Sequence, residues 1–159
     1  MKFLAAIVTF LFVFNSNLDL IRKNYVDASK SKQHAEAFYD LVNKEKETSV
    51  IAAYKGAAIA LMAKFTSDKK KRKDWFVEGV TKLENAIKED ANNVEIRLIR
   101  LSIQENTPKI LKYKSNINDD KAIIVNSFDK QNKSLKEYIR LYVKQSKVFT
   151  DSEKAQILN

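Results

Sequence analysis

Apolar residues recur every three or four positions along most of the chain, which is the spacing of one face of an α-helix. The clearest segments cover residues 18–28, 35–42, 49–65, 75–90, 93–107, 118–128 and 134–143, with a short one after residue 150. The chain has only two glycines and one proline, whereas sandwiches and barrels need many turns rich in these residues. The pattern therefore predicts an all-α fold of about seven helices, arranged as antiparallel helical hairpins.

The first 16 residues have the layout of a secretory signal peptide. One lysine precedes an apolar run from Leu4 to Phe14, and polar residues follow at once. The run is too short to span a bilayer comfortably. We therefore expect cleavage near residue 16, export to the periplasm or beyond, and a single helical domain over residues 17–159. A buried first helix and an uncleaved membrane anchor are alternatives, because Phe14 and Asn15 are not the small pair that a signal peptidase prefers.

The segment from Ser49 to Phe65 is rich in alanine and apolar nearly all round, which predicts a central, buried helix. The sequence TSDKKKRKD, residues 66–74, follows it, and we expect a solvent-exposed loop there. Its basic residues are Lys69, Lys70, Lys71, Arg72 and Lys73. Contact of these cations with an anionic envelope surface is the alternative.

The net charge of the chain says little about which class of partner it binds. The formal net charge is +9, but 24 lysines stand against five arginines, and 13 asparagines accompany them. Arginine is the residue that reads phosphates and base edges with a planar fork. A surplus of lysine and asparagine spread along the chain is more simply a compositional bias, so we expect no specific nucleic acid partner.

The central part of the chain resembles the tetratricopeptide family of helical repeats. The residues that carry the resemblance are Tyr54, Ala57, Ala58 and Leu61 at the first-helix spacing, and Gly79, Leu83 and Ala86 at the second-helix spacing. The two halves come into register only if residues 66–74 are an insertion. The layout is also similar to that of small uncharacterised exported bacterial proteins. The resemblance implies stacked helical pairs that bind proteins and perform no chemistry.

Polar residues at helical spacing interrupt the apolar segment 93–107. Arg97, Arg100 and Gln104 share one helix face and are flanked by apolar residues on both sides. Partly buried guanidinium groups need acceptors. The candidates are Glu95, Asp119, Asp120 and Glu84, with Tyr113 within reach. We expect an internal ion-pair network, and the alternative is a binding pocket for a partner's carboxylate formed by Arg97, Arg100, Gln104, Tyr113 and Asp120.

The sequence offers few candidates for catalysis. There is no cysteine, and His34 is the only histidine, so we expect no metal site and no cofactor. No glycine-rich phosphate loop or nucleophile elbow occurs. We expect a non-enzymatic binding or scaffold module for a protein or peptide partner. The alternatives are a basic peripheral protein that docks on anionic membrane or polymer surfaces and, third, a hydrolase with unrecognised carboxylates.

The signal-peptide interpretation predicts that the mature protein begins between Ser16 and Leu18 and resides outside the cytoplasm, because polar residues follow the apolar run directly. Intact mass spectrometry of protein purified from each cell fraction of the native host measures this. Recovery of a chain that keeps residues 1–14 from the soluble cytosol would contradict it.

Overall fold

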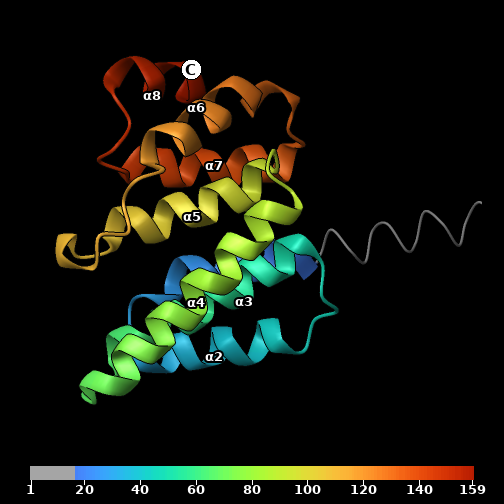
Figure 1. Ribbon diagram of the computed structural model, residues 1–159. Coiled ribbons are helices and arrows are strands. Elements are labelled where there is room, and N and C mark those ends of the chain that lie inside the picture. The colour runs from blue at the N-terminus through green and yellow to red at the C-terminus, as the bar shows by residue number, and fades with distance from the viewer. Residues whose placement is uncertain (1–16) are drawn as a thin grey trace, which may run out of the picture.

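The computed structural model describes residues 17–159, and all regular structure in this range is helical (Figure 1). The first helix covers residues 17–28. It is followed by α2 (Lys32–Asn43), α3 (Ser49–Met62), α4 (Lys69–Glu89), α5 (Val94–Asn106), α6 (Ile117–Ser127), α7 (Lys133–Gln145) and α8 (Asp151–Leu158). Single 3-10 turns form η1 (Ala63–Phe65), η2 (Lys109–Leu111) and η3 (Phe128–Lys130). The predicted all-α fold is confirmed for these residues, whereas the predicted signal peptide lies outside them.

Two hydrophobic clusters share helix α5, which lies between α2–α4 and α6–α8 (Figure 1). One cluster is built around α3 and includes Ile96 and Ile99 of α5. The other lies among α5, α6 and α7 and includes Leu98 and Leu101 of α5. Nine of the 13 residues of α5 are consequently buried. A helix with neighbours on opposite sides can place polar side chains in the protein interior only if each finds a partner there.

Helix α3 is central, as its sequence predicts, and eight of its 14 residues are buried. It packs backbone to backbone against α4. A Cβ atom added to Gly79 would lie 2.5 Å from the backbone nitrogen of Ala60, and one added to Gly56 would lie 2.7 Å from the carbonyl oxygen of Gly79. Both glycines are therefore required by the close approach of the two helices. Within residues 17–159, no helix combines the length and apolar character that a membrane crossing needs.

The prediction of a loop over residues 66–74 is wrong. Helix α4 begins at Lys69, so all five basic residues are helical, and only residues 66–68 connect η1 to it. The side chain of Asp68 caps the helix by accepting a hydrogen bond from the backbone nitrogen of Lys71. Lysine and arginine are good helix formers, so a capped basic segment continues the helix despite its exposure. The insertion that aligned the repeat halves is mostly helix.

The sequence predicts helix N-caps at Asn93, at Ser134 paired with Glu137, and at Thr150 paired with Glu153. Asn93 caps α5, and Thr150 forms a capping box with Glu153, both as expected. The expected capping box of Ser134 with Glu137 is wrong, because Asn132 caps α7. The Ser134 hydroxyl instead accepts a hydrogen bond from Arg22 and donates one to Asp19. The local pattern assigned Ser134 to a helix cap, whereas in the structure its side chain bonds residues that are distant in sequence.

Replacing Gly79 with alanine should lower the free energy of unfolding by about 1–3 kcal/mol, because overpacking forces backbone shifts. The same change on an exposed helix face raises stability by roughly 0.5–1 kcal/mol. Urea denaturation of Gly79→Ala measures the sign. Asn85→Ala, at an exposed position of the same helix, is the control and should hold or gain stability. A Gly79→Ala protein as stable as the wild type would contradict the close approach.

Candidate functional site

Arg100 lies at the centre of a buried ion-pair network between α4, α5 and α6. Its guanidinium group donates to both carboxylate oxygens of Asp120, from Nε at 2.8 Å and from NH2 at 2.7 Å. A third bond, from NH1, reaches Glu84 at 2.9 Å. Arg97 donates to the same Asp120 at 3.0 Å. The side chain of Arg100 is 3 % exposed and that of Asp120 is fully buried, so these charges satisfy one another inside the protein.

Tyr113 joins the same network from the loop that follows α5. Its hydroxyl donates to Glu84 at 2.5 Å, and its ring packs edge-on against Phe76 of α4. Burial, together with the hydrogen bond to Glu84 and the charge of that carboxylate, raises the pKa of the Tyr113 phenol. Burial alone would lower the pKa of Arg100, but the hydrogen bond and charge of Asp120, with those of Glu84, raise it overall. Both groups therefore stay protonated as donors, and the loop is held on α4.

The structure brings together four of the five residues predicted for a site on α5: Arg97, Arg100, Tyr113 and Asp120. Gln104 does not join them. Its Nε2 donates to Asn116 at 3.3 Å, and its Oε1 is buried without a partner in the described part of the chain. Asp119 is exposed, and the contacts of Arg97 and Arg100 are those that an internal network predicts.

Glu95, which we expected in the same network, pairs elsewhere. Its two oxygens accept bonds of 2.8 and 2.7 Å from the guanidinium group of Arg22, and Tyr54 donates to it at 2.7 Å. Arg22 comes from the helix over residues 17–28 and also contacts Asp19 and Ser134. This second buried ion pair links the first helix to α5 and to the start of α7.

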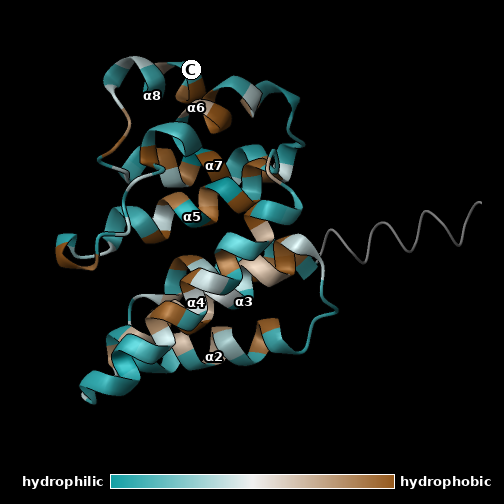
Figure 2. Cartoon of the chain, viewed as in Figure 1, coloured by the Kyte–Doolittle hydropathy of each residue, from teal (hydrophilic) through white to brown (hydrophobic). Residues whose placement is uncertain are grey.

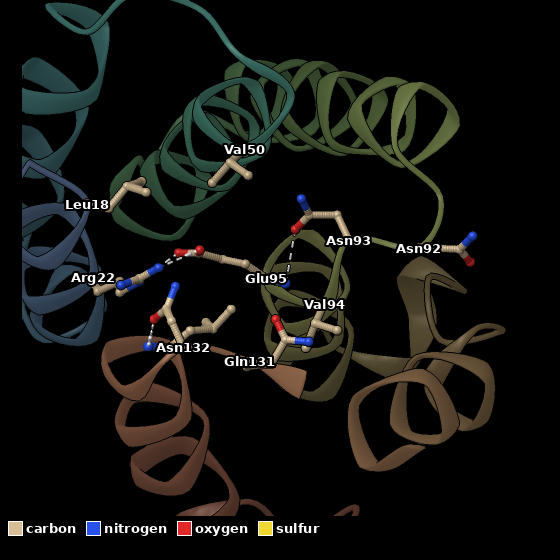
Figure 3. Close-up of a pocket in the computed structure, with 10 residues that line it drawn as sticks. Leu18, Arg22, Val50, Asn92, Asn93, Val94, Glu95, Gln131 and Asn132 are labelled. Atoms are coloured by element: carbon tan, nitrogen blue, oxygen red, sulfur yellow. Dashed lines mark hydrogen bonds and ion pairs between the residues drawn. The ribbon is translucent and has the colours of Figure 1, made fainter. Parts of the chain in front are cut away.

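A small polar pocket opens above this pair, and Figure 3 shows its lining. Asn93 and Asn132, which contribute to its wall, are the capping residues of α5 and α7. Its volume of about 230 Å³ is below the 300–1,000 Å³ that ligand pockets usually have. Because Arg22 and Glu95 are bonded to each other, we attribute this pocket to the packing of helix ends.

A larger groove, which we call the groove from here on, is lined by residues of the first helix, α3, η1, α4, α5, η2 and α7. It encloses about 1240 Å³. Tyr25, Ile103 and Tyr138, all largely buried, form part of its floor. The Tyr25 hydroxyl bonds Ser102 at 2.6 Å, and burial raises the pKa of Tyr25 to about 12 although that bond lowers it in part. The floor is therefore uncharged at neutral pH.

The margins of the groove hold most of the exposed apolar side chains. Within residues 17–159, eight large hydrophobic residues are exposed, and five of them line the groove. These five are Val26, Val77, Ile110, Leu111 and Leu141. Ile110 is 85 % exposed and Leu141 is 64 % exposed. The apolar residues of η2 stand out at the tip of the loop after α5 in Figure 2. Contiguous apolar surface of this kind marks an interaction site.

Every charged residue that lines the groove is basic. We call Lys64, Lys69, Arg72, Lys73 and Lys112 the rim cations. Three of them belong to the predicted basic segment. The other two residues of that segment have local partners, since Lys70 pairs with Asp74 at 2.6 Å and Lys71 lies over the Trp75 ring. The basic segment therefore contributes to the groove through Lys69, Arg72 and Lys73.

The potential metal ligands of the described residues are scattered over the structure. Within residues 17–159, no group of three potential metal ligands occurs, and His34 is exposed and hydrogen-bonded to Ser31. Comparison with protein-family models, curated proteins and solved structures found no match. The groove is thus the candidate functional site on its geometry alone.

Sequence analysis missed the groove, although two signals pointed to it. Leu141 lies off the apolar face formed by Leu135, Tyr138, Ile139 and Tyr142 in the same helix. Ile110 and Leu111 are apolar residues in a loop, between two lysines. Apolar residues that lie outside any packing face and gather into one patch mark an interaction surface.

Replacing Arg100 with methionine should cost about 3 kcal/mol of stability or more, because Asp120 and Glu84 lose their shared partner in the interior. Arg97→Met should cost less, since Arg97 makes one bond to Asp120 and is partly exposed. Thermal melts measure both. Lys88→Met, on the exposed face of α4, is the control and should melt like the wild type. Melts of Arg100→Met as high as the wild type's would favour the carboxylate pocket over the network.

Proposed function

We propose that this protein is an exported, non-enzymatic binding module that holds an apolar segment of a protein partner in the groove. One observation carries the proposal: five of the eight exposed large hydrophobic residues of the described chain gather on the groove. Leaving such surface in water is unfavourable by roughly 25 cal/mol per Å². A surface that folding leaves uncovered in one place is best explained by a partner that covers it.

The size of the groove favours a polypeptide over a small molecule. Its volume of about 1240 Å³ exceeds the range of roughly 300–1,000 Å³ that is usual for small-molecule sites. Its walls are helices, and helix-in-groove docking uses anchors at the i, i+3, i+4 and i+7 positions of an amphipathic helix. The apolar side chains of such a helix would pack on Tyr25 and Ile103, and Leu141 and Ile110 would contact its two sides.

The pairing of α3 and α4 supports the helical-hairpin arrangement that the repeat resemblance implies. Gly56 lies against Gly79 and Leu83, and Ala60 lies against Gly79. Positions that increase along one helix therefore meet positions that decrease along the other, as in an antiparallel hairpin. Protein binding is what the resemblance implies, and export is proposed from the pattern of residues 1–16 alone.

Docking on an anionic membrane or polymer surface is the second candidate, because Ile110 protrudes between Lys109 and Lys112. Interfacial proteins combine apolar side chains with flanking cations in this way. Surface docking through lysines weakens steeply with ionic strength, whereas a packed apolar interface does not. Retention of part of the complex at moderate salt would indicate the packed apolar interface, and its complete loss would indicate surface docking.

Photocrosslinking in the native host tests the proposed function. A benzoylphenylalanine placed at position 110 or at position 141 of the full chain should crosslink to the same segment of one protein. The same probe at position 20 is the control, because Leu20 is exposed but does not line the groove. Crosslinks to unrelated proteins, or equal yields at all three positions, would contradict the proposal.

Leu141→Ser should lower the yield of the crosslink from position 110 about tenfold, because burial of a leucine side chain is worth roughly 1.5–3 kcal/mol. Stability should be unchanged, since Leu141 is mostly exposed. Leu20→Ser removes an exposed leucine elsewhere on the surface and should leave the yield as it was. Equal yields from the two variants would separate the groove from partner binding.

A further inference from the structure

The charges around the groove specify what kind of segment it accepts. We propose that the partner segment is an amphipathic α-helix with an acidic polar face, whose carboxylates are read by Lys69, Lys73 and Lys112. This inference rests on the function proposed above, because it presumes that a polypeptide occupies the groove. It adds the charge of the partner, which the apolar surface alone does not determine.

The first observation is the uniform sign of the charges. Five cations and no carboxylate line the groove, although the whole chain contains 20 acidic residues. Within residues 17–159, Lys69, Lys73 and Lys112 form no ion pair, whereas the other two rim cations hydrogen-bond to carbonyl oxygens and Lys64 also lies over the Phe65 ring. Lys64 donates to the carbonyl of Ser29, and Arg72 donates to that of Thr66. Three ammonium groups beside the apolar surface are therefore left to a ligand.

The second observation is where two of these cations sit on α4. The N-terminus of a helix carries partial positive charge, so acidic residues are favoured in the first turn and lysines are disfavoured. Helix α4 has no acidic residue in its first turn and begins with Lys69, Lys70, Lys71, Arg72 and Lys73. These side chains are placed against the electrostatic preference of their own helix. The dipole of α4 therefore does not account for these cations, whereas a negatively charged ligand in the groove would offset their cost.

A helix fits these observations better than a membrane surface does. Ile103 and Tyr138 lie in the floor of the groove and are less than one tenth exposed. A flat bilayer would contact the protruding Ile110 and the lysines but would leave this floor uncovered. A helix can place an apolar ridge on the floor and turn its polar face toward the rim cations. Carboxylates that flank the ridge would then meet the ammonium groups on both walls, from α4 and from the loop after α5 (Figure 1).

Three synthetic peptides test the inference on the full chain. Each is a helix of about 18 residues, or about five turns, with leucines on one face and either glutamate, glutamine or lysine on the other. Fluorescence anisotropy of labelled peptides gives the dissociation constants at low and moderate salt. The glutamate peptide should bind tightest. The dissociation constant of the lysine peptide should be roughly tenfold higher or more, because like charges across an interface are strongly disfavoured.

Charge reversal at the groove should invert this order. The double variant Lys69→Glu with Lys73→Glu should bind the glutamate peptide roughly tenfold more weakly than the wild type does, and should bind the lysine peptide more tightly. The melting temperature should hold or rise, because the new carboxylates suit the helix N-terminus. Lys130→Glu with Lys133→Glu changes the net charge equally at exposed positions away from the groove, and should leave the order unchanged.

The outcomes separate this inference from the function on which it rests. If all three peptides bind equally and Leu141→Ser abolishes this binding, the groove binds polypeptides but the proposal of an acidic partner is overturned. Binding of no peptide, with adsorption to vesicles of anionic phospholipid, would overturn both in favour of surface docking. Binding of neither peptides nor vesicles would overturn both as well. An inverted order in the reversed variant, with the control unchanged, supports the acidic helix.

Discussion

The bonds between Arg100 and Asp120 are the constraint on which the arrangement of the other helices depends. Apolar packing is not directional, so leucine and isoleucine surfaces alone would let α6 slide or rotate against α5. A guanidinium group that bonds both oxygens of one buried carboxylate accepts few relative positions of the two helices. The pair contributes less to net stability than its bonds suggest, because both charges lose their hydration. Its contribution is to select one packing, and through Glu84 and Tyr113 it extends that selection to α4 and to one wall of the groove.

The ion pair of Arg22 and Glu95 fixes the position of the N-terminal end of α5, as the bonds of Arg100 fix the position of its middle. Glu95 is in the first turn of α5, where the helix N-terminus also favours a carboxylate. Arg22 carries this connection to the first helix and, through Ser134, to α7. Helix α5 is thus enclosed by two apolar clusters and positioned by two buried ion pairs. The polar residues that interrupt its apolar pattern are explained by this enclosure, since α5 meets other helices on two opposite sides.

Sequence pattern predicted the elements of this fold better than it predicted their pairing. Helical periodicity and the caps at Asn93 and Thr150 depend on neighbours within a few residues, and these predictions were correct. The pairing of Arg22 with Glu95 joins positions 73 residues apart, and no local spacing indicates it. The segment from Lys69 to Lys73 was mistaken for a loop because a run of like charges suggests solvent, whereas the cap at Asp68 and good helix formers were enough for a helix. The groove escaped prediction for a related reason: its lining comes from seven elements that only the tertiary fold brings together.

Whether a polar residue stabilises the fold or is available to a ligand depends on whether its hydrogen-bonding groups have partners inside the protein. Arg97, Arg100 and Asp120 looked like a site because charges on an apolar helix face are unusual, yet their bonding capacity is used inside the protein. The lysines of α4 looked like ordinary solvated surface, yet two of them border an uncovered apolar groove at a helix end that disfavours them. Charges that complete an internal network lower the energy of the fold and need no ligand. Charges and apolar groups that the fold leaves without internal partners are the ones that a bound molecule would stabilise, and in this protein both kinds meet at the groove.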